Sequence, residues 1–206
     1  MAEFFDCLTE DHVAMIARQP VFFVATAAAD GRINLSPKGL ADTFQVLSPT
    51  RVAYLDLAGS GNETHAHLAA DGRITLMMCN FEAPALILRL YGRGRPVLPA
   101  DPDWEGLARH FELLPGVRQI FDVAVEGVQT SCGWGVPVMG LDHHRETLPR
   151  HHAAQDPEAW VKKQAGRTRS LDGLPTRATD RYIAGPPDGG DAPCPPSPTS
   201  ATPMRT

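Results

Sequence analysis

The feature that most limits the possible folds is a succession of short apolar runs separated by turn sequences. The run at 21–28 is followed by the turn Asp30-Gly31 and by a second run at 32–36. Runs rich in β-branched and aromatic residues, bounded by such turns, predict antiparallel hairpins. Further strands are expected at 43–47, 51–57, 73–81, 85–98 and 118–132. Strands in hairpin order predict a mainly β fold, a small antiparallel β-barrel, and do not indicate a sheet of βαβ units.

Short helices are expected between the strands, because suitable capping residues precede them. Thr9 is a candidate N-cap for a helix at 10–18, with Val13, Ile16 and Ala17 on its buried side. The other expected helices are 63–70, between Asn62 and Gly72, a helix from Asp101-Pro102 to about Leu114, and one from Asp156-Pro157 to Gly166. All of them are short elements that flank the barrel.

The length of the chain suits one domain, and its composition changes near residue 175. Residues 1–175 are expected to form the folded domain. Residues 176–206 are rich in Pro, Gly, Ser and Thr and contain almost no aliphatic side chains. Such a segment cannot bury enough apolar surface to offset its ordering entropy, so it is predicted to be a disordered tail.

Charge and cysteine usage exclude several classes of protein. The net charge of -5 argues against binding to nucleic acid or to anionic membranes. No apolar stretch could span a bilayer, and Glu3 and Asp6 do not suit a signal peptide. The cysteines are scattered and form no CxxC pair, which is typical of reduced thiols. We therefore expect a cytoplasmic protein that binds neither nucleic acid nor membrane.

Two stretches carry groups that suit a phosphate. One strand ends in Ser36-Pro37-Lys38-Gly39, which presents a hydroxyl and an ammonium group. The glycine-rich loop 58–62 runs into the helix that contains Thr64, where free amides and the helix dipole favour an anion. Walker and dinucleotide spacings do not occur here. The alternatives to a phosphate site are a solvated lysine at a strand end, for Lys38, and an ordinary capped helix after a glycine turn, for the loop 58–62.

A second unusual stretch surrounds Trp134, which stands between Gly133 and Gly135. A flat ring on a mobile backbone suits stacking on a planar ligand, whereas a core tryptophan in a tight turn is the alternative. Cys132 has no evident base and is not interpreted as a nucleophile. His65 and His67 would point to different faces of a helix, so no metal site is predicted.

Taken in order, three segments resemble the pyridoxamine 5'-phosphate oxidase-related flavoproteins, the FMN-binding split β-barrels. The segments are 21–39, 54–97 and 116–137, with the motifs SPKG, GSGNET, LRLYGRG and SCGWGVP. The resemblance covers roughly residues 10 to 140, and it continues more weakly to 175. It implies a mainly β fold, a split antiparallel barrel with short flanking helices.

The same resemblance implies a homodimer with FMN at the subunit interface, where both subunits contribute to each site. By position, Asn34, Leu35, Ser36 and Lys38 would line the flavin and its phosphate, Leu55 and Asp56 would lie along the ring system or ribityl chain, Asn62 and Thr64 would close around the phosphate, and Cys132, Gly133 and Trp134 would come from the other subunit.

Two departures from the family pattern affect the expected activity. The oxidases proper carry basic residues where this chain has Glu63 and Thr64, so the positive charge must come from Lys38, with Arg73, Arg93 or Arg118 as candidates to assist. The segment that grips the vitamin phosphate in those oxidases is replaced here by residues 171–175, LDGLP. Classical pyridoxamine phosphate oxidase activity is therefore not expected.

The resulting prediction is an FMN-dependent oxidoreductase with an unidentified small-molecule substrate and NAD(P)H as a candidate electron donor. The flavin would supply the chemistry, and no catalytic residue is assigned. The alternative is a carrier of a flavin, a deazaflavin or haem on the same barrel without turnover. For haem, His67 is the candidate axial ligand.

Overall fold

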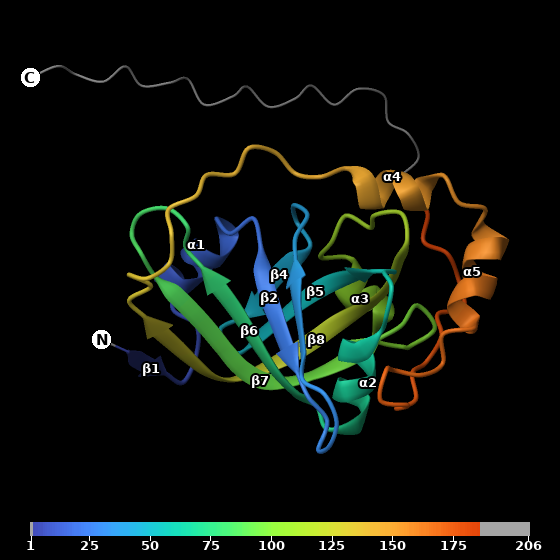
Figure 1. Cartoon of the computed structure of the whole chain (residues 1–206), viewed down its shortest axis with the longest axis horizontal. Helices are drawn as coiled ribbons and strands as arrows, with labels where there is room; N and C mark the ends of the chain where they lie inside the picture. Colours follow the sequence, from blue (N-terminus) through green and yellow to red (C-terminus); the bar gives the residue numbers. More distant parts are fainter. Residues whose placement is uncertain (1, 186–206) are drawn as a thin grey trace, which may run out of the picture.

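The computed structural model describes residues 2–185, which form a curled β-sheet with short helices at its edges (Figure 1). The strands are β1 (Glu3–Phe5), β2 (Phe22–Thr26), β3 (Asn34–Lys38), β4 (Phe44–Ser48), β5 (Arg51–Leu57), β6 (Arg73–Cys79), β7 (Ile87–Val97) and β8 (Val117–Ser131). The helices are α1 (Glu10–Ala17), α2 (Glu63–Ala70), α3 (Trp104–Ala108), α4 (Thr147–Ala153) and α5 (Pro157–Ala165).

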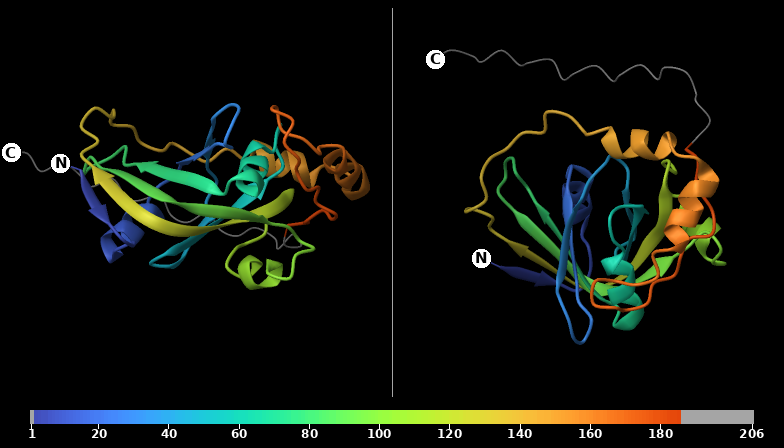
Figure 2. Two further views of the ribbon diagram at one scale, coloured as in Figure 1. Left: turned by 90° about the horizontal axis from the view of Figure 1, so that it is seen from below. Right: turned by 45° about the vertical axis from the view of Figure 1, so that its right-hand side comes forward.

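All strand pairs are antiparallel, in the order β3-β2-β6-β7-β8-β5-β4, with β1 added beside β8. Figure 2 shows the sheet curling round on itself. Within residues 2–185, β3 and β4 form no ladder with each other, so the barrel stays open along one seam. The register between β7 and β8 shifts at Tyr91/Gly92, where Glu126 of β8 is the extra residue of a β-bulge that bends this strand. A Cβ at Gly92 would lie 2.0 Å from the Ala124 carbonyl oxygen, so this close approach requires glycine.

Two apolar clusters stabilise the sheet from opposite faces. The barrel interior contains Phe22, Tyr54 and Phe121, whose rings meet edge-on or tilted, with centroids 5.0–5.3 Å apart. The outer face of β5 and β8 is covered by α3, which places Trp104 against it. Because β5 is covered on both faces, five consecutive residues of this strand are buried.

The expected strands and most of the expected helices are present, and the fold is the predicted mainly β split barrel. The predicted helix at 101–114 is wrong in extent, since α3 spans only Trp104–Ala108. Asp101 does not cap it, because its carboxylate accepts a hydrogen bond from the Leu98 backbone and pairs with Arg177. The short elements β1 and α4 are additions that the sequence pattern does not predict.

Helix α1 begins as expected, with Thr9 and His12 forming a reciprocal capping box. Of the predicted buried side, Ile16 is buried as expected, whereas Val13 and Ala17 are exposed, and His12 and Met15 are buried in their place. Burial of His12 follows from its part in the capping box and from its edge-on contact with Phe5, 4.7 Å between ring centroids.

The chain after α5 folds back over the barrel, and it passes the boundary predicted at residue 175. Arg177 donates its backbone N–H to His65, Thr179 is buried, and Ile183 accepts a backbone hydrogen bond from Gly116. The packed part of the chain therefore extends at least to Ile183. Residues 186–206, most of the predicted tail, lie outside the described residues. Among residues 2–185, no helix is both long enough and apolar enough to cross a bilayer.

Candidate functional site

Strand β3 presents a polar face toward the open seam of the barrel. Because side chains alternate along a strand, Asn34, Ser36 and Lys38 share this inward face, and Leu35 points outward with 66% of its surface exposed. The Asn34 side-chain amide donates to Thr64 Oγ1 at 3.1 Å, which links β3 to the first turn of α2. The seam is therefore lined by polar groups from β3 and from the start of α2.

Asp56, at the end of β5, is the buried anion of this region. Lys38 Nζ lies 3.2 Å from its Oδ1, and Arg118 Nε and Gln119 Nε2 donate to its Oδ2 at 2.6 and 2.7 Å. Burial acts to raise the pKa of Asp56, but the charges of Arg118 and Lys38 and the hydrogen bonds from Arg118 and Gln119 outweigh it and lower this pKa to about 2. Two cations face one carboxylate, so this group of three residues carries a net positive charge.

A directed hydrogen-bond chain supports Asp56 from behind. The Arg177 backbone N–H donates to His65 Nε2 at 3.0 Å, so the proton of the neutral ring is on Nδ1, which donates to Gln119 Oε1 at 2.7 Å. The Gln119 amide nitrogen is then free to donate to both Asp56 and Asn62 Oδ1. Burial is the largest influence on His65 and lowers its pKa, which keeps the ring neutral as the chain requires.

The start of α2 has donors available, because its N-cap side chain is used elsewhere. Asn62 makes no side-chain capping hydrogen bond, since its oxygen accepts from Gln119. The first backbone N–H groups of an α-helix have no partner within the helix, and the dipole there favours an anion. The helix packs against β2, β6 and β7, and the preceding loop is held by His152, which donates to the Ala58 carbonyl at 2.8 Å.

Ser36 carries the unsatisfied group of the cluster. Its Oγ is buried and has no hydrogen-bond partner among the described residues, although it stands between Asn34 and Lys38 on the same face of β3. A buried hydroxyl without a partner costs about 1–3 kcal/mol. An anionic oxygen placed in this cluster would satisfy it, so the donors present here fit a phosphate.

The structure brings together six of the residues that the sequence indicated: Asn34, Ser36, Lys38, Asp56, Asn62 and Thr64. Leu35 faces solvent, and Leu55 packs toward α3 in the outer apolar cluster, on the opposite face of β5 from Asp56. Arg73 and Arg93 both contact Asp71 instead of the cluster, which leaves Arg118 as the assisting cation.

Residues 132–134 do not join this cluster within one chain. They follow the far end of β8, and the thirteen residues from Gln119 to Ser131 extend over roughly 35–40 Å. Trp134 is 85% exposed and Cys132 is exposed, so the alternative of a core tryptophan is wrong. Gly133 is buried, with φ +64° and a Cβ position 3.1 Å from the Leu86 nitrogen, which holds the turn in place.

Sequence reasoning misses Gln119, His65 and Arg177, which orient the cluster. Gln119 follows Arg118, a candidate cation, but nothing in the local pattern distinguishes it. From the sequence, His65 was considered only as a metal ligand and rejected, and Arg177 lies in the segment that was predicted to be a disordered tail. Gln119 is only 1% exposed, and a buried polar side chain of this kind must have hydrogen-bond partners. This burial, which only the structure shows, identifies its role.

Fold and site together define a split antiparallel barrel with a cationic, hydroxyl-bearing cluster at its open seam. Sequence comparison then assigns the family. Residues 8–132 match the family model described as pyridoxamine 5'-phosphate oxidase. The chain is also 38% identical over 193 residues to the pyridoxamine 5'-phosphate oxidase family protein ustO of Aspergillus flavus, covering 85% of this chain and 78% of the relative. The chain belongs to the pyridoxamine 5'-phosphate oxidase family.

Solved structures of similar shape are more distant. HupZ of Group A Streptococcus is 16% identical with a TM-score of 0.48, covering 59% of this chain and 91% of that one. A FAD-binding protein from Mesorhizobium loti is 14% identical with a TM-score of 0.41, covering 64% of this chain and 99% of that one. The family assignment rests on the two sequence matches above.

Proposed function

We propose that this protein binds FMN and acts as an oxidoreductase on a small molecule, with the flavin phosphate held by the cluster at the barrel seam. The observation that carries the proposal is the buried hydroxyl of Ser36, which finds no hydrogen-bond partner within residues 2–185. It shares one face of β3 with Lys38 and with Asn34, the partner of Thr64 on α2. Membership of the pyridoxamine 5'-phosphate oxidase family supports a flavin as the ligand.

Each residue of the cluster has a distinct part in holding the cofactor. Lys38 supplies a charge-assisted contact to the phosphate, and the hydroxyls of Ser36 and Thr64 supply neutral donors. Arg118 balances Asp56, so that the carboxylate does not neutralise the site. The bound flavin supplies hydride or electron transfer at its N5 edge, while the protein positions it and tunes its electronics.

A shared site explains the position of Trp134. One chain leaves this ring 85% exposed at the far end of β8, and a homodimer would bring it to the flavin of the partner subunit. Lys38→Ala and Trp134→Ala chains, each weak in FMN binding, should then complement each other when refolded together. One site of the heterodimer carries both defects and the other carries neither, so half of its sites recover normal affinity.

Flavin fluorescence quenching measures that recovery. If a mixture proven to contain heterodimer shows no fraction of normal affinity, the two residues serve the same site and the shared-site model is wrong. The matched control is a mixture of Lys38→Ala with Ser36→Ala. Both residues lie on one face of β3, so each site of their heterodimer keeps one defect and no normal-affinity fraction should appear.

The chemistry is tested by the visible spectrum of the purified protein and its response to NAD(P)H. A bound flavin gives two absorption bands, which the reductant bleaches and air restores if electrons pass through the site. A Soret band would identify haem and overturn the proposal. His67 is a poor haem ligand here, because it is 2% exposed and its Nδ1 lies 3.1 Å from Thr26 Oγ1 inside the barrel.

A carrier without turnover is the second candidate, and one observation favours it. The titratable side chains of the cluster are already engaged: Asp56 is ionised between two cations, and both nitrogens of His65 are bonded. Neither is free to act as a general acid or base toward a substrate. A flavin spectrum that neither NADH nor NADPH bleaches would favour the carrier.

A further inference from the structure

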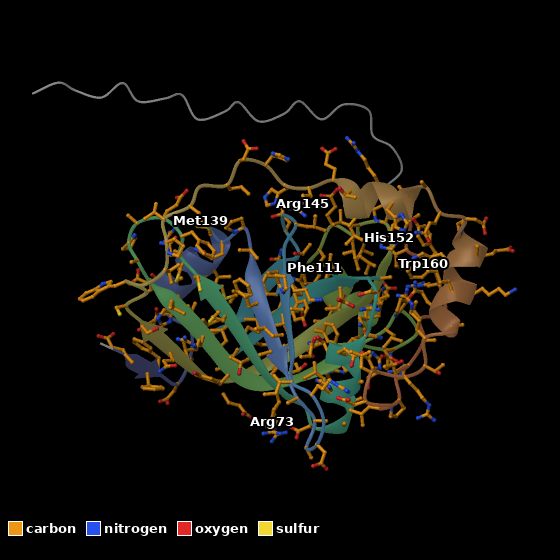
Figure 3. The ribbon with its side chains drawn as sticks, in the orientation of Figure 1. Arg73, Phe111, Met139, Arg145, His152 and Trp160 are labelled. Carbon is orange, nitrogen blue, oxygen red and sulfur yellow. The ribbon has the colours of Figure 1, made fainter. Side chains whose placement is uncertain are left out.

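A large cavity opens at the other end of the seam from α2. Its volume is about 740 Å³, within the usual range for small-molecule sites. Its walls come from residues 16–22, at the end of α1 and the start of β2, residues 40–45, the loop 80–83, and the segment 139–144. Figure 3 marks Met139 on this last segment and Arg145 just after it, where the chain passes over the strand ends, with Arg73 on the opposite side of the molecule.

The cavity continues directly from the proposed flavin site. Lys38 is the last residue of β3, and the loop that follows it forms one wall of the cavity. Phe22, the strand partner of Lys38, lines the cavity from β2. A flavin with its phosphate at Ser36 and Lys38 would therefore lie next to this space.

The loop after Lys38 has a strained backbone. Leu40 and Asp42 have φ values of +75° and +57°, which non-glycine residues seldom adopt. The Thr43 hydroxyl holds the loop by donating to the carbonyls of Gly39 and Leu40, and the Thr43 carbonyl accepts from Leu55, next to Asp56. Backbone strain of this kind concentrates at ligand sites, where the surrounding structure maintains it.

The lining indicates the chemical class of the ligand. Aromatic and aliphatic side chains predominate, among them Phe22, Phe44, Phe81, Leu40, Met139 and Leu141. The lining contains one guanidinium, Arg18, the imidazole of His144 and two carboxylates, Asp42 and Glu82, so the cavity has no cluster of positive charge comparable to that at the seam. A phosphorylated or carboxylated ligand would find little here to neutralise it.

We infer that this cavity is the binding site for a second ligand, an uncharged and largely apolar ring compound. Its role as the site of the flavin's substrate rests on the proposed function, whereas binding itself does not. The inference agrees with the missing vitamin-gripping segment, since pyridoxine 5'-phosphate carries the charge for which this lining is unsuited.

The test uses the purified full chain and two probes, the neutral naphthalene dye prodan and pyridoxine 5'-phosphate, measured by equilibrium dialysis. Prodan should bind at least about tenfold more tightly than the phosphate ester. Ala41→Trp and Ala17→Trp each add bulk at exposed positions that line the cavity, and each should weaken prodan binding by about tenfold or more. Ala159→Trp, exposed on α5 away from the cavity, should leave prodan binding unchanged.

Unchanged prodan affinity in both filling variants would overturn the inference, and so would binding of pyridoxine 5'-phosphate that is tighter than that of prodan and that both filling variants weaken. FMN affinity, measured on the same samples, separates the two proposals. Loss of prodan binding with FMN binding retained locates the dye in the cavity and supports the inference. A wild-type chain that binds prodan but no FMN would refute the proposed function alone.

Discussion

The two ends of the barrel seam recognise different chemistry by different means. At the α2 end, Lys38, Asp56 and Arg118 form a buried ionic group oriented by a chain of hydrogen bonds. At the α1 end, aromatic and aliphatic side chains surround a cavity whose wall depends on an unusual backbone conformation. The polar end depends on keeping its charges paired, whereas the apolar end depends on its shape. Substitutions should therefore affect the two ends very differently.

The largest effect is expected from Asp56→Ala. It leaves the Arg118 guanidinium, 9% exposed, without its buried partner, and breaking such a pair costs about 3–5 kcal/mol. Urea unfolding measures the loss. Asp122→Ala is the matched control, because the partners of Asp122, Arg51 and Arg95, are 46% and 51% exposed and regain water. Equal losses for the two variants would contradict the special position of Asp56.

Acid should weaken the polar end through Asp56 itself. Its pKa is lowered from 3.8 to about 2 in the folded chain, so the ion pairs stabilise the fold above pH 3.8 and the stabilisation is lost as the pH falls through about 2. The loss amounts to roughly 2 kcal/mol. Unfolding free energies of wild type and Asp56→Asn across this range give the difference. Parallel pH profiles would show that Asp56 is not the group responsible.

A milder dependence on pH is expected near neutrality from His65. Burial lowers its pKa below 6.5, so the unfolded chain takes up the proton more readily, and stability falls as the pH drops below 6.5. His12 and His152, whose pKa values are also lowered by burial, act in the same direction. His65→Gln should flatten the profile between pH 7 and 5 in part. If the slope of the unfolding free energy against pH is the same in His65→Gln and wild type, His65 does not contribute to this pH dependence.

The smallest effect is expected from Arg177→Ala. The guanidinium is 55% exposed where it pairs with Asp101, and surface pairs of this kind contribute about 0–1 kcal/mol. The backbone N–H that bonds His65 survives the substitution. Urea unfolding should therefore show a loss below about 1 kcal/mol. A loss as large as that of Asp56→Ala would mean that the side chain, and not the backbone, anchors this segment.

How much could be predicted from sequence differs between the two ends. The resemblance of residues 21–39 to the family indicated Asn34, Ser36 and Lys38, but it also indicated Leu35, which the two-residue alternation of β3 turns to the outer face. The support from Gln119 could not be foreseen, since it depends on a strand register set by the whole sheet. The cavity could not be predicted either, because its walls come from four separate segments that only tertiary packing brings together.

Two predictions, the extent of the helix at 101–114 and the end of the packed chain at residue 175, were wrong for a related reason. Asp101 looks like an N-cap in the local sequence, but tertiary pairing with Arg177 redirects its carboxylate. Residues 176–185 were predicted to belong to a disordered tail because they contain few aliphatic side chains. Three of them are nevertheless held by specific contacts, the backbone of Arg177 with His65, the hydroxyl of Tyr182 with His152 and the burial of Ile183.

The central claim, that the seam cluster holds the flavin phosphate, is tested most directly by comparing FMN with riboflavin on two proteins. Both ligands are titrated into wild type and Lys38→Ala, and fluorescence quenching gives each Kd. Removing a charge-assisted contact worth roughly 1.5–3 kcal/mol should weaken FMN binding by about 10- to 100-fold and leave riboflavin binding nearly unchanged, because riboflavin has no phosphate. Equal weakening of both ligands, or no weakening of FMN, would contradict the claim.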